Sequence, residues 1–320
     1  MEIHCTACKK KYILSPEQAE KLVSVPKIPC PACGTLIITQ IEKPAFISKE
    51  KLLKQTGALP PMPEILIRAK SIIDSPYGDI RDLADILEKD QAMTSRLLKL
   101  ANSAYYGLRY PVESAHKACL VLGEQTLLQM ITIVSTSKLF SNNLDGYDLD
   151  AATVFSHALF VALVSRDICK NRFKVLENSA FAAGLLHDAG MLVLDSHIKN
   201  TKAHYRKLRD KGLSQHAAEK EFFGFDHAEI GYDFCINWNV PADQALAIRW
   251  HHEPRMADSD LAHVLYTADI LAWQDPDRIP GDDLDEVSFR RVGLSSEELH
   301  EIRSRAWQDV AQIVADILIS

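Results

Sequence analysis

Apolar residues recur every three to four positions over most of this chain, a spacing that places them on one face of a helix. The pattern is clear over residues 65–73, 154–168 and 261–273, and it predicts a terminal helix from Ser296 to about Ile319. Beyond residue 58 we find no convincing alternation of apolar and polar residues of the kind that β-strands show. The chain is therefore predicted to be mainly all-α.

The first part of the chain departs from this pattern. Residues 11–14 and 35–40 are predicted to be short strands, and two CxxC pairs separated by 21 residues stand beside them. The four cysteines are Cys5, Cys8, Cys30 and Cys33. A CxxC turn points both sulfurs to one side, and two such turns can close a tetrahedral four-cysteine zinc site. Incidental cysteines or a redox pair are the alternatives.

The cysteine-containing segment resembles bacterial zinc-ribbon domains. A segment of this size has little core, so a bound zinc ion would supply much of its folding free energy. We predict a small β zinc ribbon with structural zinc over residues 1–42 and a linker over 43–57. A helical domain is expected over 58–256, and a C-terminal helical extension over 257–320 is expected to pack on it.

Composition limits the partners and the location of the protein. The 320 residues are 47% hydrophobic and 25% charged, with a net charge of −7 and an isoelectric point of about 5.9. This acidic balance argues against nonspecific binding to nucleic acid or anionic lipid. No apolar run approaches the ~20 residues of a membrane span, and the N-terminal residues lack the apolar core of a secretory signal. We therefore expect a cytoplasmic protein with no membrane partner.

The cytoplasm is reducing, so the seven cysteines are expected to be metal ligands or buried thiols rather than disulfides. Cys119, Cys169 and Cys235 stand alone in apolar helical patterns and are predicted to be buried packing residues.

Several ionisable residues lie in strongly apolar surroundings. The stretch GLLHDAGMLVL, residues 184–194, places His187 and Asp188 in an apolar run. His157 and Asp269 share the apolar faces of two predicted helices. Such groups are costly to bury unless a cation or several hydrogen-bond donors accompany them.

Three more histidines lie in or beside predicted helices. His227 opens a predicted helix after Asp226, a candidate N-cap, and the pair His251-His252 ends another helix. A lone core histidine usually just bonds a backbone carbonyl. A carboxylate next to a histidine, however, can bridge two cations roughly 3.5–4 Å apart. Imidazoles and carboxylates together suit iron, manganese or zinc, so the sequence predicts one or two of these divalent metals.

This pattern resembles the HD superfamily of metal-dependent phosphohydrolases, whose H…HD…D signature is matched by His157, His187, Asp188 and Asp269. The additional ligands of its HD-GYP branch, which hydrolyses cyclic di-GMP, are matched by His227, His251 and His252.

Longer stretches between about Leu59 and Glu253 are similar to another branch, the HDOD domain. They read LPPMPEIL, DILEKDQAMTSRLLKLANSAYYG, AHKACLVLGEQTLLQM and GLLHDAGMLVL. The resemblance implies an all-helical HD-superfamily bundle. It also implies a regulatory role in bacterial signalling, with protein partners and often without catalysis.

The sequence departs from the HD-GYP enzymes in two places. Met191 stands where those enzymes carry a lysine after the His-Asp doublet, and no GYP motif follows the histidine pair. A methionine cannot neutralise a phosphate oxygen as a lysine can. Arg249, Arg255 or Lys199 are candidates to replace that cation.

Three functions therefore stay open. The first is a regulatory HDOD protein with a retained metal site and protein contacts. The second is an active metal-dependent phosphohydrolase or phosphodiesterase with a nucleotide ligand, in which Asp188 is the catalytic residue that bridges the metals. The third is a nucleic-acid-associated regulator that works through the ribbon, which the acidic balance disfavours. The remaining marked histidines, expected at the surface or in caps, are His197, His204, His216 and His263.

Overall fold

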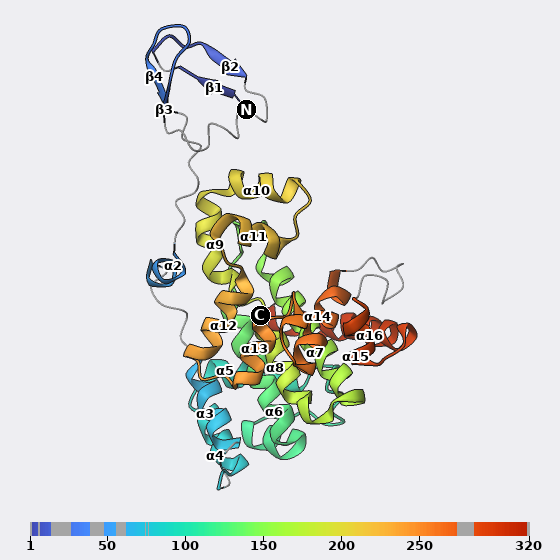
Figure 1. Ribbon diagram of the computed structural model, residues 1–320. Helices are drawn as coiled ribbons and strands as arrows, with labels where there is room; N and C mark the ends of the chain where they lie inside the picture. Colours follow the sequence, from blue (N-terminus) through green and yellow to red (C-terminus); the bar gives the residue numbers. More distant parts are fainter. Residues whose placement is uncertain are drawn as a thin grey trace. The chain divides into compact units, whose positions relative to one another are not determined.

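The chain divides into two compact units, residues 1–48 and 49–320, and its fold is mainly all-α (Figure 1). The computed structural model describes residues 2–5, 7–13, 27–38, 48–55, 62–73, 75, 77–273 and 285–318. Most of the predicted linker lies outside the described residues; α2 falls within its predicted range.

The N-terminal unit consists of two antiparallel strand pairs, β1 with β2 and β3 with β4. The strands are β1 (Glu2–His4), β2 (Lys11–Ile13), β3 (Lys27–Pro29) and β4 (Leu36–Ile38). The two predicted strands correspond to β2 and β4, and each pairs with a strand that the sequence analysis did not identify. Cys5, Cys30 and Ile37 form the small buried core of this unit.

The second unit is helical. Its elements are α2 (Lys49–Gln55), α3 (Glu64–Ile73), α4 (Ile80–Glu88), α5 (Gln91–Ala101), α6 (Ala115–Leu139), α7 (Ala151–Arg172), η1 (Lys174–Leu176), α8 (Glu177–Leu186), α9 (Met191–Asn200), α10 (Lys202–Asp210), α11 (Gln215–Phe223), α12 (His227–Asn237), α13 (Ala242–Arg249), η2 (Pro254–Met256), α14 (Asp260–Trp273), α15 (Glu286–Val292) and α16 (Ser296–Leu318).

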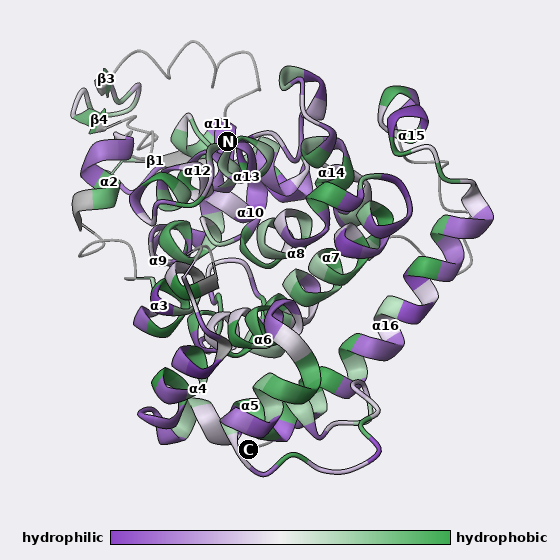
Figure 2. Ribbon diagram, turned by 90° about the horizontal axis from the view of Figure 1, so that it is seen from below, coloured by the Kyte–Doolittle hydropathy of each residue, from purple (hydrophilic) through white to green (hydrophobic). Residues whose placement is uncertain are grey.

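Helix α7 lies at the centre of this unit and packs against α8, α14 and α16. Hydrophobic and hydrophilic residues alternate in bands along α16, as an amphipathic helix requires (Figure 2). One core extends from Leu66 to Ile317 and so includes both the predicted helical domain and its C-terminal extension. The boundary predicted between those two parts stays a prediction.

Helices α6 and α7 are each long and apolar enough to cross a membrane by length and composition alone, which the sequence analysis did not anticipate. The most apolar window of α7 is 72% buried inside the protein, and that of α6 is 50% buried. Burial of this kind is what a core helix of a globular unit shows.

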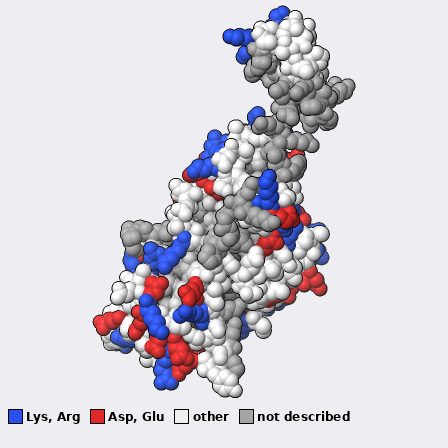
Figure 3. All heavy atoms as spheres, turned by 90° about the vertical axis from the view of Figure 1, so that its left-hand side faces the viewer, with Lys and Arg blue, Asp and Glu red and all other residues white. Residues whose placement is uncertain are grey.

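The surface of the helical unit carries both signs of charge. On the face drawn in Figure 3, Lys and Arg side chains lie among Asp and Glu side chains. Among the described residues, Arg68 pairs with Glu64 and Arg81 with Asp79, each at 2.5 Å. Interspersed charges of this kind do not form a single-sign field on the face that is shown.

Two glycines of the GLLHDAG stretch allow close backbone approach. A Cβ atom on Gly184 would lie 2.6 Å from the Cα of Ala162 in α7, and one on Gly190 would lie 2.0 Å from the carbonyl oxygen of His227. Neither contact is sterically possible for a larger residue without movement of the backbone. These glycines therefore bring α7 and the start of α12 against the His-Asp doublet.

Candidate metal centre

The predicted histidines and aspartates meet inside the helical unit. They come from α7 and α14, from the residues that directly follow α8 and α13, and from the first residue of α12. The cluster consists of His157, His187, Asp188, His227, His251, His252 and Asp269. Every member is buried except His252, whose side chain is 17% exposed.

Asp188 lies between the histidines. One carboxylate oxygen, Oδ2, is 3.4 Å from Nε2 of His157 and 3.2 Å from Nε2 of His187. The other oxygen, Oδ1, is 3.1 Å from Nε2 of His227 and 3.8 Å from Nε2 of His251. Each oxygen thus faces a different set of imidazoles, which is the arrangement that a bridging carboxylate needs.

Asp269 faces the cluster from α14. Its Oδ1 lies 3.2 Å from Nε2 of His157 and 4.0 Å from Nε2 of His187, and its Oδ2 lies 3.7 Å from Nδ1 of His252. Possible ligand atoms form two groups, in each of which all atoms lie within 4.8 Å of one another. One group is Asp188, His227, His251 and His252, and the other is His157, His187 and Asp269.

The far nitrogens of two imidazoles are held by backbone carbonyl oxygens. Nδ1 of His187 lies 2.8 Å from the carbonyl oxygen of Gly184, and Nδ1 of His251 lies 2.7 Å from that of Ile248. Carbonyl oxygens only accept hydrogen bonds, so Nδ1 carries the hydrogen and Nε2 presents a lone pair. Nε2 of His251 is buried and has no hydrogen-bond partner among the residues that the structure describes.

Electrostatics act differently on different members of the cluster. Although burial alone would lower both pKa values, the neighbouring carboxylates raise the pKa of His157 to about 9 and that of His227 well above its usual value, so a metal would displace a proton from each of these rings. Burial, together with nearby His187 and His227, lowers the pKa of His251 to about 4, so its imidazole is neutral. Burial alone would raise the pKa of Asp188, but the surrounding imidazoles lower it well below its usual value. The carboxylate is therefore ionised.

The donor set fits a metal ion. Possible ligand atoms converge here, since Nε2 of His157 lies 3.2 Å from Nε2 of His187 and Nε2 of His227 lies 2.8 Å from Nε2 of His252. Neutral imidazoles and carboxylates are the ligands of zinc, iron and manganese. A cation at this point would be surrounded by these nitrogen atoms and by the carboxylate oxygens of Asp188 and Asp269.

Sequence reasoning missed one residue of this site, Glu219 in α11. Its carboxylate is fully buried, and Oε2 lies 2.7 Å from the backbone nitrogen and 2.6 Å from Nδ1 of His227. The hydroxyl of Tyr147 donates to Oε1 at 2.8 Å. Glu219 stands in the charged run Glu219-Lys220-Glu221, so no local feature of the sequence distinguishes it from a solvated residue.

Two of the histidines expected at the surface or in caps are placed differently. His263 is only 2% exposed, and its Nδ1 lies 2.7 Å from the hydroxyl oxygen of Ser288, so that expectation is wrong. The His216 ring stacks on the ring of His252, with centroids 4.3 Å apart and an interplanar angle of 15°. His216 therefore belongs to the surroundings of the cluster.

Each cation proposed to replace the enzymes' lysine is already paired with a carboxylate. Lys199 pairs with Asp145 at 2.5 Å, Arg249 with Glu229 at 3.1 Å and Arg255 with Asp285 at 2.7 Å. Met191 is buried and lines a pocket of about 20 Å³ together with His157 and Asp188. This pocket holds about one water molecule rather than a nucleotide.

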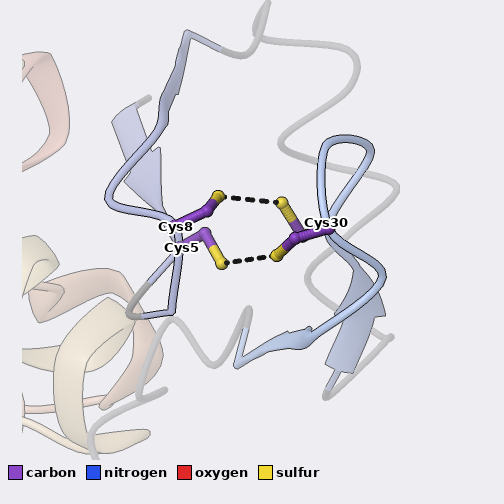
Figure 4. Close-up of side chains that lie close together, drawn as sticks. Cys5, Cys8 and Cys30 are labelled. Atoms are coloured by element: carbon purple, nitrogen blue, oxygen red, sulfur yellow. Dashed lines mark hydrogen bonds between the residues drawn. The ribbon is translucent and has the colours of Figure 1, made fainter.

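The four N-terminal cysteines also come together (Figure 4). The sulfur atoms of Cys5 and Cys33 are 3.6 Å apart, as are those of Cys8 and Cys30. A tetrahedron with Zn–S bonds of about 2.3 Å has S–S edges of about 3.8 Å, so the separation suits zinc.

The two cysteine turns have the same backbone design. The amide of Lys9 donates to the carbonyl of Cys5, and the amide of Gly34 donates to that of Cys30, both at 2.9 Å. Lys9 and Gly34 each follow the second cysteine of a pair and have positive φ angles of 57° and 73°. The Tyr12 hydroxyl, 3.1 Å from the Cys30 sulfur, lowers the pKa of that thiol to about 6.

Comparison with protein families gives a match to the HDOD domain over residues 59–254. A protein from Treponema pallidum (strain Nichols) is 23% identical over 196 residues, which are 61% of this chain and 37% of that protein. The chain thus spans little more than a third of the length of this curated relative.

Solved structures share the helical fold. An HDOD domain protein from Geobacter sulfurreducens has a TM-score of 0.67 and 23% identity, with 83% of this chain and 96% of that chain covered. A candidate phosphohydrolase from Shewanella amazonensis SB2B has a TM-score of 0.68 and 23% identity, with 83% and 97% covered. A candidate signal transduction protein from Marinobacter aquaeolei VT8 has a TM-score of 0.64 and 23% identity, with 83% and 61% covered.

Proposed function

The chain belongs to the HDOD domain family, and on this basis we propose that it is a bacterial regulatory protein whose helical unit binds one or two divalent metals. The observation that carries this proposal is the position of Asp188, whose two oxygens face two different groups of imidazoles. His227, His251 and His252 would complete one coordination shell, and His157, His187 and Asp269 would complete the other. Iron, manganese and zinc all suit this donor set.

A regulatory role is favoured over catalysis by the surroundings of the cluster. Met191 replaces the lysine that would neutralise a phosphate, and the pocket beside it has room for about one water molecule. We expect the signal to pass through contacts with protein partners in the cytoplasm.

Metal content of the whole chain tests the proposal. The protein would be purified without oxygen or chelator and compared with an Asp188→Ala variant and a Cys30→Ser variant by elemental analysis. We expect the native protein to hold more than one metal ion, Asp188→Ala to lose only the helical metal, and Cys30→Ser to lose only the ribbon zinc. Equal metal content in the native protein and Asp188→Ala would exclude the helical centre.

A second candidate is a metal-dependent phosphohydrolase or phosphodiesterase acting on a nucleotide, which the shared carboxylate of Asp188 favours. Two metals at such a site polarise a phosphoryl oxygen and lower the pKa of a bound water. Asp188, as the catalytic residue, would bind both metals. The stacked rings of His216 and His252 lie at the less buried side of the cluster. Phosphate release from a panel of nucleotides by the metal-loaded protein, and its loss in Asp188→Ala, would establish this activity.

The N-terminal unit is proposed to be a zinc ribbon held by Cys5, Cys8, Cys30 and Cys33. Zinc would hold the two cysteine turns together, and strands β1 to β4 would form the exposed surface of the ribbon. A ribbon that binds nucleic acid is the third candidate, and the net charge of −7 disfavours it. Steep salt dependence of RNA or DNA binding, lost in the Cys30→Ser variant, would support it.

A further inference from the structure

The helical unit contains a second cavity, with a volume of about 370 Å³, whose lining includes no member of the histidine cluster. It lies where α3 and α6 face α8 and α13, and Leu66, Leu128 and Leu186 contribute to its apolar wall. Its size falls within the range of about 300–1,000 Å³ that is typical of small-molecule sites. Neither the family resemblance nor the metal centre accounts for it.

Polar groups of this cavity are amides and hydroxyls. Nδ2 of Asn178 donates to Oε1 of Gln125 at 2.7 Å, and Nε2 of Gln244 donates to the Ser179 hydroxyl oxygen at 3.2 Å. These hydrogen bonds connect α8 with α6 and with α13. An amide offers two donors and an acceptor with two lone pairs, so these side chains have capacity beyond the bonds they make.

None of the described residues that line the cavity is charged. A charged ligand would lose its hydration here without a counter-ion, which is costly. A suitable ligand has an apolar body and a carbonyl, amide or hydroxyl group. Its apolar body would pack against the leucines, and its polar group would form a hydrogen bond with the amide side chains. The chemistry therefore selects a small, uncharged, amphipathic molecule.

The cavity is connected to the histidine cluster through two helices. Leu186 of the cavity wall is the last residue of α8 and directly precedes His187. The carbonyl of Gly184 in α8 holds Nδ1 of His187, and the carbonyl of Ile248 in α13 holds Nδ1 of His251. A shift of either helix therefore moves an imidazole directly.

We propose that this cavity binds a small uncharged amphipathic molecule and that its binding is transmitted to the histidine cluster through α8 and α13. The cavity would then be the sensory site of the protein. Ligand binding stands on the cavity alone, whereas the transmission rests on the proposed metal centre. By thermodynamic linkage the ligand and the metal must change each other's affinity by the same factor.

Methionine methyl groups labelled with carbon-13 provide reporters for both sites in the intact chain. Met62 lines the cavity, Met191 lines the small pocket beside Asp188, and Met256 is 63% exposed and serves as a control. Benzamide is an uncharged probe of suitable chemistry, and benzoate is a charged probe of nearly equal shape. NMR spectra would be recorded during titration with each probe.

We expect benzamide to shift the Met62 resonance saturably, with a dissociation constant on the order of 1 mM for so small a ligand. Benzoate should not shift the Met62 resonance comparably, and neither probe should shift the Met256 resonance comparably. A Met62 resonance that ignores benzamide, or that responds equally to benzoate, would overturn the binding proposal.

Two variants locate the probe. Ala182→Phe fills the cavity from α8 and should abolish the Met62 response, whereas Ala242→Phe, at an exposed position of α13, should retain it. Gln244→Glu places a charge in the cavity with little change of size and should also abolish binding, which decides the matter if Ala182→Phe fails to fold. Benzamide binding that survives Gln244→Glu would contradict the assignment.

Transmission is measured by zinc titration, followed at Met191, with and without saturating benzamide. We expect benzamide to change the zinc dissociation constant by at least about fivefold. An unchanged constant would overturn the transmission and leave binding intact. A Met191 resonance that does not respond to zinc at all would reject the metal centre and the transmission together, while the Met62 response still decides ligand binding.

Discussion

The buried carboxylate of Glu219 contacts His227 twice, at the backbone nitrogen and at Nδ1, with distances of 2.7 and 2.6 Å. These contacts fix both the first turn of α12 and the orientation of its imidazole. Nε2 of His227 is thereby directed at Asp188, 3.1 Å away. A carboxylate behind a histidine is the usual support of a metal-ligating imidazole, because it fixes the tautomer and raises the basicity of the ligand.

Replacing Glu219 by Gln should therefore weaken metal binding by about 10–100-fold. The amide keeps an acceptor for Nδ1 but loses the negative charge that makes the imidazole a stronger ligand. Metal affinity would be measured by competition with a chromophoric chelator. Tyr147→Phe is the matched control, since it removes only the hydroxyl bond to Oε1 and should have a smaller effect in the same direction. Native metal affinity in Glu219→Gln would show that this carboxylate serves folding alone.

Replacing Gly190 by Ala should destabilise the helical unit, because the new Cβ would meet the carbonyl oxygen of His227 at 2.0 Å. Overpacking of this kind costs about 1–3 kcal/mol or more, and the displaced α12 should also lower metal content. Gly231→Ala is the milder control: its Cβ would lie 3.1 Å from the Cγ2 methyl of Ile248, a contact relieved by a shift of a few tenths of an ångström, and alanine favours a helix. Urea unfolding of both variants checks this, and equal losses would contradict the importance of the Gly190 contact.

Removing the ribbon zinc with a chelator should unfold the N-terminal unit and leave the helical unit intact. The small core of the ribbon contains Cys5, Cys30 and Ile37, so little apolar burial would remain to hold it without metal. Hydrogen exchange over residues 2–13 and 27–38 should rise to the rate of an unfolded peptide. Far-ultraviolet circular dichroism, which reports mainly the helices, should hardly change. Protection of the ribbon that persists after zinc is gone would contradict its dependence on metal.

A surface contact between α6 and α4 should make a small part of the stability depend on pH. Nδ1 of His116 lies 2.9 Å from Glu88 and Nε2 lies 3.2 Å from Asp85, and the Glu88 contact raises the pKa of His116 above 6.5. When the pKa of a histidine is higher in the folded protein than in the unfolded chain, the contact contributes its full stability at a pH below the unfolded-state pKa. This contribution is lost as the pH rises through the folded-state pKa. In solutions below pH 6.5, His116→Gln should therefore lower the urea concentration at the unfolding midpoint. In alkaline solution the same substitution should have less effect. A difference that does not vary with pH would exclude the ion pair as its cause.

The helical architecture and the metal-centre candidates could be predicted because both leave local marks in the sequence. Apolar spacing identified α7, α14 and α16, and His187-Asp188 was conspicuous in its apolar run. The candidate cap Asp226 is confirmed in the same way, since its side chain accepts a hydrogen bond from the amide of Glu229. Such features depend on neighbours within one or two turns of chain.

What the sequence could not show depends on contacts between distant elements. His263 has no local partner, and only the packing of α15 against α14 provides Ser288 to bond it. Glu219 acquires its role because α11 and α12 meet at His227, and nothing in the spacing of these residues fixes that meeting. The same holds for β1 and β3, which become recognisable as strands only through their pairing with β2 and β4.

Burial of the histidine cluster also sets a time scale. Six of its seven side chains are buried, so an ion cannot leave or enter unless helices around it separate locally. The rate of exchange is then the rate of that opening rather than the rate of ligand dissociation. If the proposed centre binds metal, titrations of the folded protein with zinc must therefore be long enough for this opening to occur.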